Sequence, residues 1–116
     1  MSQEIPQKPT RRKKSKPDMV LNIEGNFKDF TDFYDENKEI IYKNILNLFD
    51  TLLETNQKKL TLSVVAKIRG LEWDTDFTFS KSDKETLIRD VMPYFEQTED
   101  YETCSKIIKL HESLTL

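Results

Sequence analysis

The sequence predicts an α+β domain with a long helix, an antiparallel β-hairpin, and two C-terminal helices packed on one face of the sheet. Two observations lead to this fold class. Apolar and polar residues alternate along residues 60–79 on both sides of Arg69-Gly70, as in a hairpin with one buried face. Apolar residues recur every three or four positions in residues 36–55 and 83–114, as on one face of a helix.

The first 18 residues differ in composition from the rest of the chain. They hold six of the 18 basic residues and two of the 21 acidic ones, so the remainder is strongly acidic. Three prolines and few large apolar side chains leave too little to bury to offset the entropy of ordering. We therefore expect a disordered basic arm over residues 1–18 and a single α+β domain over residues 19–116.

Residues 19–24 alternate briefly and favour a short third strand, and Gly25-Asn26 then marks a turn. Aromatic residues between positions 27 and 34 follow at the spacing of one helical turn. The long helix is expected over residues 36–55. Carboxylates gather around its start, where they favour the positive end of the helix dipole: Asp29, Asp32, Asp35, Glu36 and Glu39.

The hairpin has a definite register. With Arg69-Gly70 as a two-residue loop, Ile68 faces Leu71, and each step outward adds one pair. A slip of one residue would place apolar side chains against charged ones. The inner face then carries three aromatic residues that we expect beneath the helices: Trp73, Phe77 and Phe79. An aromatic platform for single-stranded nucleic acid is the alternative interpretation of these residues, but the alternation favours a core face.

The C-terminal half contains clear helix signals. Ser82 to Glu85 matches the capping-box pattern, which predicts a helix starting at Asp83. Pro93 lies inside the apolar stripe that follows and should kink or restart the helix. A short break at residues 98–100 separates it from a last helix that starts near Tyr101.

Residues with catalytic or metal-binding chemistry are few. Asp74 and Asp76 could together hold a divalent cation or serve acid–base chemistry, but a solvated strand face has the same pattern and no third ligand is nearby. His111, the only histidine, is expected to be a structural or surface residue. Cys104, the only cysteine, is expected in the core, and no intramolecular disulfide can form. We expect no enzyme activity, no metal and no cofactor.

The basic arm is the strongest local signal of function, and it is formed by Arg11, Arg12, Lys13, Lys14 and Lys16. It could contact phosphates, act as a nuclear import signal, or bind an acidic protein surface. An arm that binds no defined ligand is as plausible as these three roles together. The acidic remainder argues against a broad nucleic-acid interface, because phosphate would repel it.

The strand from Leu60 to Ile68 is long, and its edge needs a cover, either from residues 19–24 or from another chain. We therefore place a partner-binding edge at Val65, Lys67 and Arg69. The leading hypothesis is a small, non-catalytic regulatory or adaptor protein that binds another protein or a second copy of itself. The alternative is a nucleic-acid-associated protein whose arm contacts phosphate.

The sequence contains no run of 18 apolar residues, and residues 1–18 contain no apolar stretch, so we expect neither a membrane span nor a secretory signal. We expect a soluble intracellular protein in the cytoplasm, or in the nucleus if the arm directs import.

Overall fold

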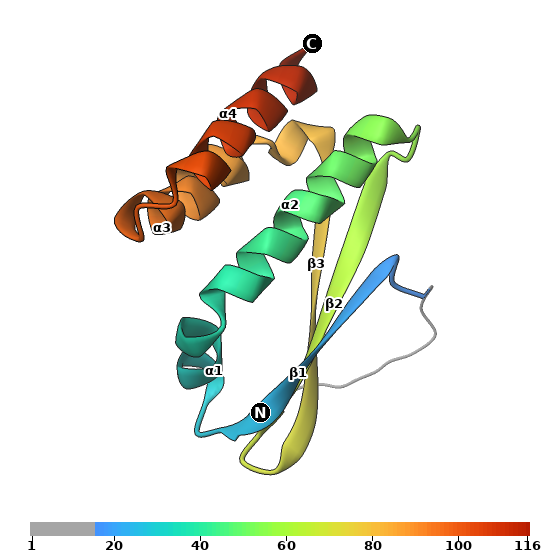
Figure 1. Ribbon diagram of the computed structural model, residues 1–116. Coiled ribbons are helices and arrows are strands. Elements are labelled where there is room, and N and C mark those ends of the chain that lie inside the picture. Colours follow the sequence, from blue (N-terminus) through green and yellow to red (C-terminus); the bar gives the residue numbers. More distant parts are fainter. Residues whose placement is uncertain (1–15) are drawn as a thin grey trace.

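The computed structural model describes residues 16–116, so the predictions for residues 1–15 lie outside the described part of the chain. The α+β fold class is confirmed (Figure 1). The elements in chain order are β1 (Met19–Phe27), α1 (Phe30–Glu36), α2 (Lys38–Glu54), β2 (Lys59–Ile68), β3 (Leu71–Ser80), the 3₁₀ turn η1 (Lys81–Asp83), the π-helical turn η2 (Leu87–Val91), α3 (Met92–Gln97) and α4 (Tyr101–Thr115).

The three strands form one mixed sheet in the order β1-β2-β3, with β2 in the centre. β1 runs parallel to β2, and α1 and α2 provide the crossover that a parallel pair requires. β1 is the third strand that the alternation at residues 19–24 favours. It covers the edge of β2, so of the two covers considered for this edge, the chain itself supplies one.

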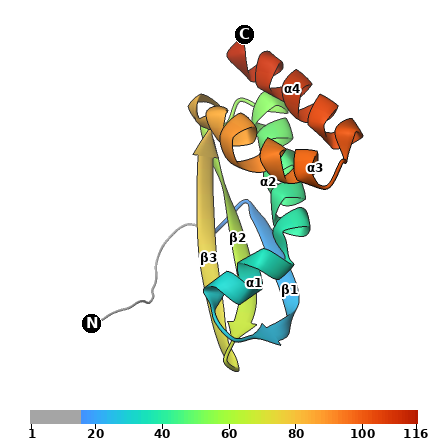
Figure 2. The ribbon, with the colours of Figure 1, turned by 90° about the vertical axis from the view of Figure 1, so that its left-hand side faces the viewer.

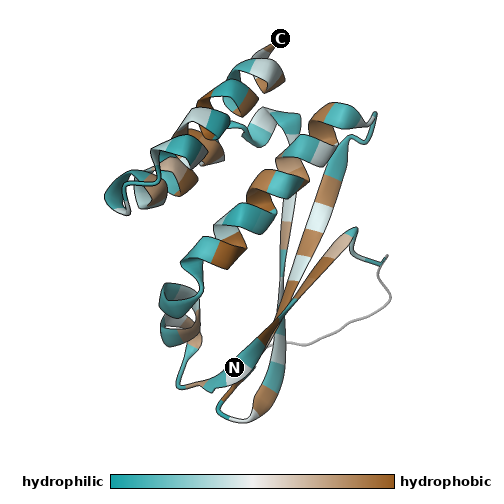
Figure 3. Ribbon diagram, viewed as in Figure 1, coloured by the Kyte–Doolittle hydropathy of each residue, from teal (hydrophilic) through white to brown (hydrophobic). Residues whose placement is uncertain are grey.

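The hairpin register is confirmed at every predicted pair, from Leu60 with Phe79 to Ile68 with Leu71. Arg69 and Gly70 have φ angles of 55° and 79°, as the two central residues of a type I′ turn require. Apolar and polar bands alternate along both strands (Figure 3). Local sequence therefore specifies the hairpin down to its residue pairs.

β1 is longer than predicted, and the turn placed at Gly25-Asn26 is wrong. The strand passes through Gly25 in a β-bulge, where φ is 126° and the register shifts between Asn22 and Asn26. Beyond the bulge, the side-chain oxygen of Asn26 accepts a hydrogen bond of 2.8 Å from the Gly70 N–H. The end of β1 therefore holds the hairpin turn in place.

Asp18 fixes the other end of β1. Its N–H donates to the Thr61 carbonyl at 3.0 Å, and its carboxylate accepts from the Thr61 N–H at 2.8 Å. These two hydrogen bonds tie the residue before β1 to the start of β2.

The helices cover one face of the sheet, and the core lies between them and that face (Figure 2). The long helix α2 supplies its central part, and η2, α3 and α4 extend the core towards the C-terminus. The side chains with no measurable exposure are Leu48, Phe49, Leu52, Leu62, Leu87, Val91 and Ile107.

The capping box forms two residues earlier than the sequence pattern suggests. Ser80 is the capping residue, and its N–H donates to the Asp83 carboxylate at 2.8 Å. The helix expected to kink or restart at Pro93 does not restart there, because the π-helical turn η2 passes directly into α3 and Pro93 lies in the first turn of α3. Pro93 has no backbone N–H to donate to the preceding turn, and the change from π-helical to α-helical geometry lies just before it.

Candidate protein-binding surface

The turn end of the hairpin projects past the helices (Figures 1 and 2). Trp73 is 48% exposed and Leu71 is 66% exposed. The expectation that Trp73 is buried is therefore wrong. The physical reason is length: β2 and β3 each have ten residues, and no helix of the described chain reaches over their turn end.

Phe77 and Phe79 lie further up β3 and are partly buried against the core, as the alternation predicts. The Phe79 ring lies 5.2 Å from the Phe49 ring of α2. On the inner face of β3, Thr75, Phe77 and Phe79 are partly buried, and Trp73 and Leu71, nearer the turn, are exposed. The inner-face row of β3 therefore extends past the helices that cover its other end.

A groove of about 440 Å³ opens above Phe77 and Phe79. Tyr34 of α1, Tyr42 of α2, and Arg89 and Asp90 of η2 are among the residues that line it. Together with Trp73 and Leu71, the groove makes the inner face of β3 an accessible, largely aromatic surface. We call this surface, from Leu71 to Phe79 with its two tyrosines, the β3 inner surface.

The two tyrosines that line the groove contact each other. The Tyr34 and Tyr42 hydroxyls form a hydrogen bond of 2.6 Å. Burial, followed by this hydrogen bond, raises the pKa of Tyr42 far above its ordinary value of 10.0. Tyr42 is therefore protonated at neutral pH, and the pair offers aromatic surface and hydrogen bonds.

The outer face of β3 has the opposite chemistry. Glu72, Asp74 and Asp76 follow one another at every second position and are exposed. No described helix covers this face (Figure 2). Within residues 16–116, no cluster of three or more histidine, cysteine or acidic side chains could hold a metal ion. The three carboxylates therefore form a row of negative charge along one side of a strand.

The partner-binding edge expected at Val65, Lys67 and Arg69 needs correction. Val65 and Lys67 lie on the central strand and are paired with β1 on one side and with β3 on the other. Arg69 binds the end of β1, because its N–H donates to the Phe27 carbonyl at 2.8 Å and its Nε donates to the Lys28 carbonyl at 3.0 Å. The outer sheet edges belong to β1 and β3.

Of the basic arm, Arg11, Arg12, Lys13 and Lys14 lie outside the described residues, and Lys16 is exposed at the start of the described chain. The role predicted for the arm stays a prediction.

His111 and Cys104 both have positions that packing explains. His111 Nε2 lies 3.1 Å from the Glu85 carboxylate, which joins α4 to the segment before η2. No local pattern predicts this pair, because its members are 26 positions apart. Cys104 is buried, and desolvation raises the pKa of its thiol.

Two acidic residues around α1 accept hydrogen bonds from backbone N–H groups of the same chain. Asp29 caps α1 by accepting a hydrogen bond from the Asp32 N–H at 2.8 Å, and Asp32 accepts one from the Lys28 N–H at 3.1 Å. This second bond lowers the pKa of Asp32, whose hydrogen bond and charge in turn raise the pKa of Glu36. Asp29, Asp32 and Glu39 lie at helix starts, as predicted, whereas Asp35 and Glu36 lie in the last turn of α1.

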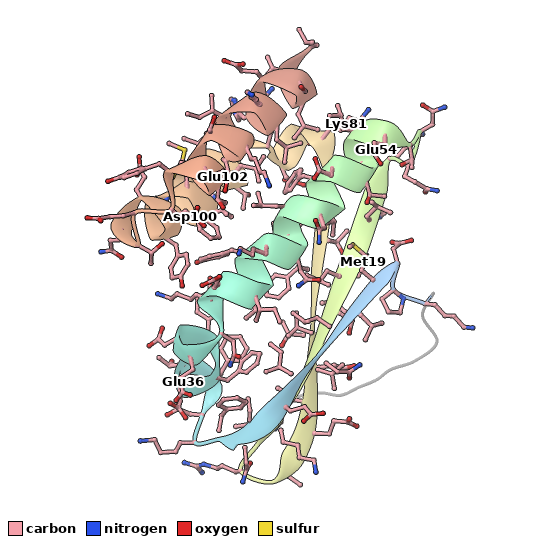
Figure 4. All side chains as sticks on the ribbon, viewed as in Figure 1. Met19, Glu36, Glu54, Lys81, Asp100 and Glu102 are labelled. Atoms are coloured by element: carbon pink, nitrogen blue, oxygen red, sulfur yellow. The ribbon has the colours of Figure 1, made fainter. Side chains whose placement is uncertain are left out.

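A larger groove of about 610 Å³ runs between α2 and α4. Asp100 and Glu102 mark its α4 side in Figure 4, and Lys43 and Asp50 line its α2 side. Charges of both signs alternate in it, and Lys43 already pairs with Glu39 at 3.1 Å. It has neither the aromatic side chains of the inner face of β3 nor the single charge sign of the outer face.

Comparisons with known proteins give no relative from which to transfer a function: no family model, no curated protein and no solved structure matches the chain. Among residues 16–116, no helix is long and apolar enough to cross a membrane.

Proposed function

We propose that this chain is a small non-catalytic protein that acts as a regulator or adaptor by binding another protein through the β3 inner surface. The observation that carries the proposal is the joint exposure of Trp73 and Leu71 at the turn end of the hairpin. Partly covered aromatic residues next to a groove are typical of the anchors of protein interfaces.

The exposed part of Trp73 is large enough to matter for affinity. A fully covered aromatic side chain buries about 150–250 Å². Covering the free half of Trp73 would remove ~100 Å² from water and contribute ~2.5 kcal/mol at ~25 cal/mol per Å². Leu71 would add a smaller amount. The free energy of binding is smaller than this sum, because association also costs translational, rotational and side-chain entropy.

Affinity purification of the full chain from its native cells, with and without nuclease, tests the proposal. The informative variant is Leu71→Ser with Trp73→Ser. The matched control is Ile108→Ser on α4, which removes an exposed apolar side chain at 43% exposure on a different surface. We expect a partner that survives nuclease and Ile108→Ser but is lost with the double variant. Recovery of no partner that depends on the hairpin end would refute the proposal.

The nucleic-acid alternative depends on the arm and is tested separately. Deleting residues 1–18 would also remove the Asp18 bonds to Thr61, so substitution is the cleaner change. Replacing Arg11, Arg12, Lys13 and Lys14 by serine in the full chain should abolish a salt-sensitive interaction with DNA or RNA if the alternative is correct. The same variant should leave a hairpin-dependent protein complex unchanged.

A further inference from the structure

We propose that the outer edge of β3 binds an extended segment of a partner protein in which basic and large apolar residues alternate, so that the segment adds a fourth strand to the sheet. This inference rests on the proposed protein-binding function and specifies the partner chemistry.

β3 is the better of the two outer edges for strand addition. It pairs continuously with β2 over all ten of its residues, from Leu71 to Ser80. At its outer side, every second residue presents a backbone N–H and a C=O that pair with no described strand. β1, the other edge, is interrupted by the bulge at Gly25, and bulges disfavour further pairing.

The two faces of β3 specify the side chains of an added strand. Leu71, Trp73 and Phe77 lie on the inner face, and Glu72, Asp74 and Asp76 lie on the outer face. Neighbouring strands place side chains of the same face against each other. A segment with apolar residues at alternate positions and lysine or arginine between them complements both faces at once.

A second copy of this chain does not meet this requirement. In a symmetric antiparallel pairing of two β3 strands, outer-face residues face outer-face residues, so the carboxylate rows would oppose each other. Like charges directly opposite are destabilising. The acidic row therefore protects the edge against self-association while it leaves the edge open to a basic segment.

The basic arm of the chain itself also fits poorly. Residues 11–16 are basic at every position except Ser15 and contain no large apolar side chain. The arm could neutralise the outer face, but it has nothing to place on Trp73.

The test uses the full chain and a nine-residue peptide that alternates lysine and valine. Binding is followed by the fluorescence of Trp73, the only tryptophan. We expect saturable binding that is lost when glutamate replaces lysine in the peptide, and lost again when alternate peptide nitrogens are methylated, because methylation removes the main-chain donors.

Two charge reversals locate the site. Asp74→Lys should weaken binding about tenfold, because a carboxylate in the row becomes a repelling cation. Glu112→Lys on α4 changes the net charge equally and should alter the affinity less than twofold. Equal effects of the two reversals, or indifference to methylation, would overturn strand addition.

Two further outcomes would assign the edge to another occupant and also overturn the inference. One is a concentration-dependent dimer of the free chain that Asp74→Lys alters. The other is peptide binding that appears only when Arg11, Arg12, Lys13 and Lys14 are replaced by serine, which would assign the edge to the arm. If the peptide fails to bind while a cellular partner still depends on Trp73, the proposed function stands and only strand addition fails.

Discussion

The same substitution at two positions on the inner face of the hairpin should have very different costs. Leu62 lies on the central strand with no measurable exposure, whereas Leu71 is 66% exposed at the turn end. Leu62→Ala removes buried methyl groups and leaves a cavity, which costs ~2–5 kcal/mol in well-packed cores. Leu71 buries about a third of its surface, so Leu71→Ala should cost roughly 0.5 kcal/mol.

Urea unfolding followed by circular dichroism measures both costs, and Trp73 emission provides a second probe. Domains of this size have a free energy of unfolding of about 5–15 kcal/mol. Over most of this range the loss is smaller than the total stability, so the Leu62→Ala variant should remain folded. If it does not, Val64→Ala makes the same comparison with a smaller deletion at a position that is 2% exposed.

The result that would refute this reasoning is a loss at Leu71 within about 1 kcal/mol of the loss at Leu62. Such a result would mean that the turn end is covered in solution by a second chain or by residues 1–15. The exposure of Trp73, on which the proposed function depends, would then be an incorrect premise.

Three further predictions concern the bulge, the thiol and one carboxylate. Gly25→Ala should destabilise the fold by about 1–3 kcal/mol in urea unfolding, because φ is 126° and a Cβ would lie 3.0 Å from the Phe27 ring; a neutral result would contradict the bulge geometry. Cys104 should react with a thiol reagent only after unfolding, because burial restricts access and raises its pKa; rapid labelling of the native chain would show that α4 opens readily. Burial, and then the charge of Glu54, raises the pKa of Asp50 above its ordinary value of 3.8. The Asp50 carboxyl group therefore holds its proton more tightly in the folded chain than in the unfolded chain, and its ionisation destabilises the fold as the pH rises above 3.8. Asp50→Asn should therefore stabilise the protein at pH 7 by less than about 1 kcal/mol, with no gain at pH 3; an equal gain at both would contradict the titration.

Local patterns predicted much of the molecule. The alternation and the Arg69-Gly70 turn fixed the hairpin register, because pairing across a two-residue loop joins residues that are close in sequence. The period of three and four identified α2, whereas Pro93 lies inside a continuous helical run and does not restart it. The helix-start signal chose the wrong serine, because Ser80 and Ser82 both have a carboxylate three positions later and only the path of the chain after β3 selects between them.

The candidate site was less predictable. The sequence placed the open edge at Val65 and Lys67, which in the folded chain lie on the central strand between two neighbours. Parallel pairing between β1 and β2 joins residues about 40 positions apart, and a short alternation at residues 19–24 specifies no partner strand. The row of Glu72, Asp74 and Asp76 was visible in the sequence, but its position at an outer edge was not.

The amino-acid sequence by itself determined which segments become helices and strands and which hairpin residues face each other, since these depend on interactions between neighbours along the chain. Only the tertiary structure decided where apolar residues stay exposed. Trp73 and Phe77 have the same phase and the same chemistry, yet Phe77 packs against the core and Trp73 does not. The difference arises because the helices cover only part of the sheet, and the position at which that cover ends is set by the packing of distant segments.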